Sequence, residues 1–265
     1  MTKIHTETRG GVTVIELNDP PANTYSYEMM QEIDAAVLRA RMNAAVHVIV
    51  IRGGGEKFFC AGANIGMLKD ADPDFKYYFC LHANETLTRL EQTPKLVIAA
   101  LNGHTVGGGL EVALAADIRI AKQNAGKIGL PEVALGVLPG TGGTQRLARL
   151  IGKARAIELM ATGRLLSMDD AKALGIVHDV WGDAELQGRS FNDAIHDYAK
   201  QFTPPNKASR AVGRMKRAVQ SGPEAGLLEG LSIERELQRL LFQSEDAKEG
   251  LAASLEKRTP RFAGR

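Results

Sequence analysis

The feature that most constrains the fold is the alternation of short β-branched runs with helical stretches in the first half of the chain. Val12–Leu17 is predicted to be a strand, and Val46–Ile51 and Leu96–Leu101 are nearly continuous apolar runs typical of buried strands. Tyr27–Met42 is predicted to be a helix with one apolar face. Further helices are expected to begin near Ala63, Glu85 and Gly108, and short strands are expected at Ile118–Ala121 and Lys127–Leu130. Strands that alternate with helices at this spacing predict an α/β fold.

After Gly143 the pattern changes to almost continuous helix. Helices are expected at Thr144–Thr162, Asp169–Leu174, Ala184–Gln201, Asn206–Gln220, Pro223–Phe242 and Ser244–Arg258. Prolines separate the last of them, because proline starts a helix well and cannot continue one. The sequence therefore predicts an α/β core over residues 1–200, followed by a helical region over residues 201–265.

Charge and cysteine content exclude several classes of protein. The chain has 33 Lys and Arg against 31 Asp and Glu, so it lacks the concentrated basic surface that nucleic-acid binding needs. Its apolar runs are far shorter than the roughly 18 residues that span a membrane. Cys60 and Cys80 form no CxxC pair, and the first residues contain no apolar signal core. We expect a cytoplasmic protein in a reducing compartment, without membrane or nucleic-acid partners.

Glycine is unusually frequent and is clustered. The chain has 28 glycines in 265 residues, against a usual share of about 7%. They gather at Gly53–Gly55, at Gly107–Gly109 and in Gly140–Gly143, beside predicted strand ends and helix starts, where glycine lets the backbone approach a ligand. Their spacing fits neither a dinucleotide fingerprint nor a phosphate-binding P-loop, and no HExxH or His/Cys metal motif occurs. We therefore expect loops that touch a small molecule, and no metal.

Two glutamates lie in these apolar, glycine-rich surroundings. Glu111 is in the first turn of the helix expected after Gly107–Gly109, and Glu132 follows Pro131 in an otherwise apolar segment. Taken singly, Glu111 is explained by the preference for acids at helix N-termini, worth about 0.3–1 kcal/mol, and Glu132 by a surface turn. Together, two carboxylates in a partly desolvated pocket can have their pKa values pushed apart. Such a pair can add water to a double bond or remove it.

Two small-residue turns precede helices in the same way. Phe58–Ile65 and Asn102–Glu111 each place small residues directly before a predicted helix. Unpaired backbone N–H groups lie at the positive end of such a helix. Two of these donors that converge on one point make an oxyanion hole, in which the loss of one donor typically costs about 10²–10³ in rate.

In combination, these segments resemble the crotonase superfamily, and specifically the enoyl-CoA hydratases. The motifs are Phe59-Cys-Ala-Gly-Ala-Asn64, Asn102-Gly103 with Gly107-Gly-Gly-Leu-Glu111, and Pro131-Glu132 followed by Gly136–Arg146. The likeness extends from the first predicted strand to Arg258. It implies a spiral of ββα units with a helical C-terminal trimerisation region. It also implies a homotrimer, or a hexamer made of two trimers.

The resemblance implies a role for each motif. The carbonyl oxygen of a coenzyme A thioester would be held by the backbone N–H groups of Ala63 and Gly108. Glu111 would act as the base on water, Glu132 would deliver a proton to the α-carbon, and the N–H of Gly140 would help to place the water. Coenzyme A is part of the substrate, so no separate cofactor is implied.

Further positions match substrate-binding positions of the family. They are Ala22, Ala61, Asn64, Ile65, Gly107, Pro131 and Pro139. Asn64 replaces the usual aspartate, and Gly66 stands where a lysine or arginine often contacts the coenzyme phosphates. Lys57, Lys257 and Phe262 are candidate substitutes for that contact, the last two from a neighbouring subunit.

The paired glutamates favour hydration of trans-2-enoyl-CoA, a step of fatty-acid β-oxidation. Related isomerases often keep only the glutamate that matches Glu132, so isomerisation of an enoyl-CoA is an alternative. A pathway-specific acyl-CoA dehydratase is another. An RNA-binding relative is a third, but the balanced charge and the lack of a basic stripe with interspersed aromatics argue against it.

Overall fold

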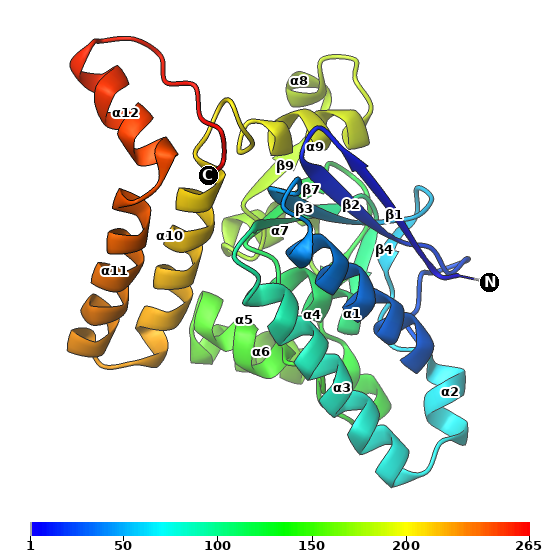
Figure 1. Cartoon of the computed structure of the whole chain (residues 1–265). Helices are drawn as coiled ribbons and strands as arrows, with labels where there is room; N and C mark the ends of the chain where they lie inside the picture. The colour runs from blue at the N-terminus through cyan, green and yellow to red at the C-terminus, as the bar shows by residue number, and fades with distance from the viewer. Residues whose placement is uncertain (1) are drawn as a thin grey trace.

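A six-stranded sheet forms the centre of the molecule. The computed structural model describes residues 2–265. The strands follow the order β1 (Ile4–Arg9), β2 (Val12–Leu17), β3 (Val48–Gly53), β5 (Leu96–Leu101), β7 (Ile118–Lys122) and β9 (Asp179–Trp181) (Figure 1). The β1–β2 pair is antiparallel, and every later pair is parallel. Every residue of β5 is buried, as its uninterrupted apolar run predicts.

A second, three-stranded parallel sheet is made of short strands. They are β4 (Phe58–Cys60), β6 (His104–Val106) and β8 (Ile128–Gly129). Each follows a strand of the large sheet in the chain and precedes a helix or a 3₁₀ turn. This repetition confirms the expected α/β spiral of ββα units, and it places the loops after β4, β6 and β8 side by side.

Helices on one side of the large sheet enclose the main core. They are α1 (Tyr27–Met42), α2 (Ile65–Asp70), α3 (Pro73–Glu91) and α4 (Gly108–Leu114). The side chain of Ser26 caps α1, and that of Asp72 caps α3. This cap starts α3 well before Glu85, where the sequence pattern placed its beginning. On the opposite face of the sheet, α9 (Phe191–Lys200) packs Phe191 against a smaller apolar cluster.

Two of the long helices expected after Gly143 are broken. The remaining elements are η1 (Glu132–Leu135), α5 (Gly143–Ile151), α6 (Lys153–Thr162), α7 (Met168–Ala173), α8 (Asp183–Leu186), α10 (Ser209–Ser221), η2 (Gly222–Glu224), α11 (Leu227–Phe242) and α12 (Glu245–Leu255). Gly152 separates α5 from α6 with a φ of 84°. Gln187 and Gly188, with φ values of 50° and 79°, separate α8 from α9. Positive φ cannot be continued in a right-handed helix, so neither single helix forms.

The C-terminal helices leave the body of the protein. In α10, Lys216 pairs with Asp117 at 2.8 Å and donates to the carbonyl of Lys95, whereas α11 and α12 lie on the outer side of α10 (Figure 1). This buried ion pair joins α10 to the residue that precedes β7. The division into an α/β core over residues 1–200 and a helical region over residues 201–265 stays a prediction. Within residues 2–265, no helix is both long and apolar enough to cross a membrane.

Candidate active site

The loops after the short strands surround one cavity of about 680 Å³. Its wall is mostly apolar and is formed by Ile65, Leu68, Phe79, Val106, Ala134, Leu135, Val137 and Leu138. Its polar side chains are few: Tyr25, Glu111, Glu132 and Thr141, with Lys69 and Lys76 also in the lining. An apolar pocket with a few convergent polar groups is the usual form of a small-molecule site.

Glu111 points into this cavity from the first turn of α4 and is only 2% exposed. Its Oε1 accepts hydrogen bonds from the backbone N–H groups of Thr141 (2.8 Å) and Gly143 (2.7 Å), and its Oε2 accepts one from the Thr141 hydroxyl. A Cβ on Gly143 would lie 2.9 Å from Oε1, so only glycine allows this approach. Burial raises the pKa of Glu111, while these hydrogen bonds and the charge of Arg146 oppose the rise.

Glu132 faces the same cavity with different surroundings. It is the first residue of η1. Its Oε1 lies so near Gly107 that a Cβ added to that glycine would be 3.0 Å from the oxygen. Its Oε2 is buried and has no hydrogen-bond partner among residues 2–265. Burial raises the pKa of Glu132 to about 7; a hydrogen bond from its own backbone N–H opposes the rise, and the negative charge of Glu111 adds to it. A carboxyl group with this pKa can give up or take a proton near neutral pH.

Two backbone N–H groups lie close to the glutamates. Gly108 is the first residue of α4, and its N atom is 3.0 Å from where a Cβ of Gly62 would stand. Ala63 follows Gly62 and forms a β-bridge with Tyr25. In this bridge the Tyr25 N–H donates to the Gly62 carbonyl, and the Asn64 N–H donates to the Tyr25 carbonyl. In the described part of the chain, the N–H groups of Ala63 and Gly108 donate to no protein acceptor. They are therefore available to a carbonyl oxygen in the cavity.

Most of the predicted site residues line this cavity. They are Ala61, Ala63, Ile65, Gly107, Gly108, Glu111, Pro131, Glu132 and Gly140. Three other predicted site residues contact the segments that form the cavity. The carbonyl of Ala22 accepts from the Ala61 N–H at 3.0 Å, the Asn64 side chain caps α2, and buried Pro139 lies against Gly143.

The predicted coenzyme contacts lie elsewhere in the single chain. The Nζ of Lys57 is 5.6 Å from the centre of the Phe58 ring. Lys257 follows α12, and Phe262 lies beside Gly250 in the C-terminal segment. Because Lys257 and Phe262 were expected to act on a neighbouring subunit, their role stays a prediction. Lys69 and Lys76, which line the cavity, were not singled out from the sequence.

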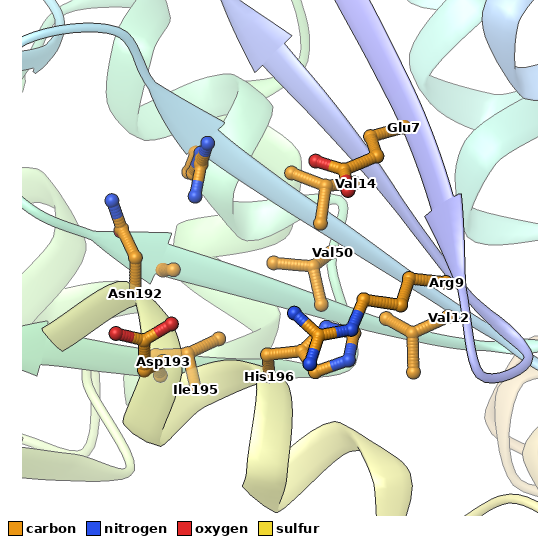
Figure 2. Close-up of a pocket in the computed structure, with 11 residues that line it drawn as sticks. Glu7, Arg9, Val12, Val14, Val50, Asn192, Asp193, Ile195 and His196 are labelled. Carbon is orange, nitrogen blue, oxygen red and sulfur yellow. The ribbon is translucent and has the colours of Figure 1, made fainter. Parts of the chain in front are cut away.

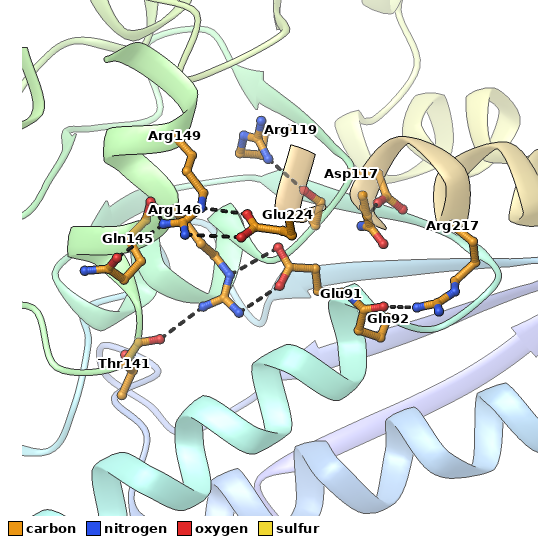
Figure 3. Close-up of polar contacts among 12 residues, drawn as sticks. Glu91, Gln92, Asp117, Arg119, Thr141, Gln145, Arg146, Arg149, Arg217 and Glu224 are labelled. Carbon is orange, nitrogen blue, oxygen red and sulfur yellow. Dashed lines mark hydrogen bonds and ion pairs between the residues drawn. The ribbon is translucent and has the colours of Figure 1, made fainter. Parts of the chain in front are cut away.

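The contacts that hold the loop around Thr141 were not predicted from the sequence. Arg146 of α5 pairs with Glu91 at 2.9 Å and reaches the Thr141 carbonyl at 3.4 Å (Figure 3). The amide of Asn84 donates to the Gly140 carbonyl at 3.1 Å. These contacts join the glycine-rich loop to α3 and α5. Thr141 is the one residue with a side chain in Gly140–Gly143, and that is the signal that could have identified it.

A second hollow lies on the other face of the sheet, beside α9 (Figure 2). It measures about 90 Å³ and is lined by His196 and by charged side chains of both signs, among them Glu7, Arg9 and Asp193. Arg52, also in its lining, already pairs with Glu16 at 2.7 Å. This volume holds only a few atoms, so the cavity that contains Glu111 and Glu132 is the candidate active site.

Comparisons with known proteins identify what the chain is similar to. The family model described as enoyl-CoA hydratase/isomerase matches residues 7–265. A short-chain-enoyl-CoA hydratase from Clostridium acetobutylicum is 36% identical over 253 residues, covering 95% of this chain and 94% of that protein. A crotonyl-CoA hydratase from Syntrophomonas wolfei is 35% identical over 252 residues, with the same coverage of both chains. The crystal structure of an enoyl-CoA hydratase from Geobacillus kaustophilus has a TM-score of 0.95 and 44% identity, covering 100% of this chain and 98% of that one.

Proposed function

The chain belongs to the enoyl-CoA hydratase/isomerase family, and we propose that it adds water reversibly across the 2,3 double bond of trans-2-enoyl-CoA thioesters. One observation carries the proposal: Glu111 and Glu132 face one apolar cavity with opposite hydrogen-bonding surroundings. Glu111 is surrounded by donors that favour its charged form. Glu132 is buried beside the negative charge of Glu111, and its Oε2 has no partner within residues 2–265, so its neutral form is favoured.

In the proposed reaction, the thioester carbonyl accepts hydrogen bonds from the N–H groups of Ala63 and Gly108. Glu111 takes a proton from a water molecule as the water oxygen bonds to C3. The electron pair of the double bond moves towards the thioester, and the resulting enolate oxygen is stabilised by the two N–H donors. Glu132 then gives its proton to C2. The product contains one added water, and the proton on Glu111 returns to Glu132 to reset the pair.

The experiment that tests this proposal offers the protein two substrates. With a trans-2-enoyl-CoA such as crotonoyl-CoA, we expect rapid loss of the absorbance of the conjugated thioester and a product heavier by one water. With a trans-3-enoyl-CoA, we expect little gain of that absorbance. The opposite pattern would identify an isomerase and contradict the hydratase proposal.

One observation favours isomerisation as a second candidate. Both oxygens of Glu111 already accept hydrogen bonds, whereas Oε2 of Glu132 has no partner within residues 2–265. A single carboxyl group that takes a proton from one carbon and returns it to another is enough for double-bond migration. The two-substrate experiment decides between the candidates.

The pH dependence of hydration follows from the Glu132 carboxyl group. Its pKa of about 7 lies above its ordinary value, and hydration needs its protonated form. We therefore expect kcat/KM for crotonoyl-CoA to fall as pH rises through about 7, approaching a tenfold loss per pH unit. Steady-state rates between pH 5 and pH 9 measure this, with each sample returned to pH 6.5 to exclude denaturation. A kcat/KM that rises through this range would reverse the roles of the two glutamates.

We also propose a cytoplasmic homo-oligomer, a trimer or a pair of trimers. Leu227 and Leu228 of α11 and Leu255 of α12 are 77%, 75% and 86% exposed, and a second copy of the chain would cover such apolar side chains. Light scattering of the purified protein tests this, and a monomer at micromolar concentration would refute it.

A further inference from the structure

We propose that the Thr141 hydroxyl, supported by the Tyr25 hydroxyl, is a positioning group that keeps Glu111 ionised and so leaves the single proton of the pair on Glu132. The inference rests on the proposed function, because it explains how that site divides its acid and base roles. It concerns two side chains, Thr141 and Tyr25, that lie beside the reacting groups.

The hydroxyls form a chain of donors that ends on Glu111. The Thr141 hydroxyl donates to Glu111 Oε2, and its oxygen lies 3.2 Å from the Tyr25 hydroxyl. A threonine hydroxyl has one proton, so Thr141 must accept from Tyr25 while it donates to Glu111. Thr141 and Tyr25 are 3% and 2% exposed. In such a buried chain each bond polarises the next.

The two glutamates differ in the donors that other residues supply. Glu111 receives three: the N–H and the hydroxyl of Thr141, and the N–H of Gly143. Oε2 of Glu132 receives none from residues 2–265. Hydrogen bonds to the charged form of a carboxyl group favour that form. One proton shared by the pair is therefore held by Glu132.

The other titratable groups that face Glu111 do not account for this difference. They are Glu132 of η1, Cys80 of α3, Arg146 of α5 and Tyr25 before α1. Burial raises the pKa values of Tyr25 and Cys80, so both stay neutral. The charge of Arg146 favours ionised Glu111, but it is largely balanced by Glu91, to which Arg146 donates two hydrogen bonds (Figure 3). Among residues 2–265, the Thr141 hydroxyl is thus the one side-chain donor bonded to Glu111.

The test measures the titration of Glu111 without any turnover. In a Glu132→Gln background, infrared difference spectra against pH report the protonation of Glu111, identified by loss of the signal on adding Glu111→Gln. Adding Thr141→Val removes the hydroxyl and keeps the backbone N–H. A hydrogen bond to a charged group is worth about 1.5–3 kcal/mol, so we expect the Glu111 midpoint to rise by about one to two pH units.

Two matched variants complete the design. Thr141→Ser restores a hydroxyl and is expected to return the midpoint to that of the Glu132→Gln background. Tyr25→Phe removes only the outer hydroxyl and is expected to raise the midpoint by less than Thr141→Val. If Thr141→Val does not fold, the Tyr25→Phe shift tests the same chain of donors. An unchanged midpoint in Thr141→Val, or in Tyr25→Phe where it stands alone, would overturn the inference.

Kinetics on otherwise unmodified protein give the second readout. Thr141→Val is expected to lower kcat for crotonoyl-CoA by about tenfold or more, with little change in KM, and Thr141→Ser to recover most of it. A lower kcat with an unchanged Glu111 midpoint would show a merely structural role and contradict the inference. Because the infrared titration needs no substrate reaction, its result stands even if the protein fails to hydrate crotonoyl-CoA. Failure of the inference is thereby distinguished from failure of the proposed function.

Discussion

Replacing Glu132 by Gln is expected to lower kcat for crotonoyl-CoA hydration by about 10²–10⁴-fold, the usual contribution of a positioned acid or base. The amide has nearly the shape of the carboxyl group, so the cavity and the binding of the thioester are retained. What is lost is a proton that can be delivered to C2. Steady-state kinetics near pH 6.5 measure the effect. Glu158→Gln, at an exposed position on α6, is the control and is expected to keep full activity.

The same substitution is expected to stabilise the fold above neutral pH. The pKa of Glu132 in the folded protein, about 7, exceeds its ordinary value of 4.5, so the folded state disfavours the ionised form. The free energy of unfolding therefore falls as pH rises from about 4.5 to about 7, and glutamine escapes this loss. Thermal denaturation should show a Tm gain for Glu132→Gln at pH 8 that is absent at pH 4.

For the kinetic prediction, a Glu132→Gln variant that keeps more than about a tenth of the parental kcat would contradict the role of Glu132 as the acid.

Replacing Gly108 by Pro is expected to lower kcat by about 10²–10³-fold more than replacing it by Ala. Gly108 is the first residue of α4, where a helix tolerates proline because that N–H has no partner within the helix. Both substitutions add a Cβ, which would lie 2.0 Å from the Tyr25 hydroxyl oxygen and force Tyr25 to move. Only proline also removes the N–H proposed to hold the thioester oxygen.

The alanine variant is therefore the matched control for the steric effect. The ratio of the two kcat values, with Tm measured for both variants, isolates the N–H group. Equal kcat values in two folded variants would place the oxyanion donor at another residue.

The large elements could be predicted from the sequence, because each follows from local physics. The helix Tyr27–Met42 and the strand Leu96–Leu101 have the predicted bounds: the first has a serine cap and an apolar face, and the second is an unbroken apolar run. The predicted strand Lys127–Leu130 contains β8, but β4 and β6 were not predicted, because they are three residues long and exist only by pairing within the small sheet. A periodicity of so few residues cannot be recognised. The breaks at Gly152 and Gln187 depend on backbone angles that composition does not encode.

The candidate site was predictable in part for the same reason. Glu111 and Glu132 stand in recognisable motifs, and both line the cavity. Tyr25 and Thr141 are separated by 116 positions, so their contact is visible only in the folded chain. Lys69 and Lys76 were missed because a lysine on a helix is usually a solvated surface charge. The motifs thus predicted two glutamates that line the cavity, while the contact between Tyr25 and Thr141 required the structure.

We propose, above all, that this cavity adds water to a carbon–carbon double bond. The most direct test is to incubate the protein with crotonoyl-CoA in water enriched in ¹⁸O and to analyse the product by mass spectrometry. We expect a product heavier by one ¹⁸O-containing water, with the label on C3, formed by the parent protein and much more slowly by Glu132→Gln. Loss of the conjugated absorbance without any gain in mass would show double-bond migration and contradict the account.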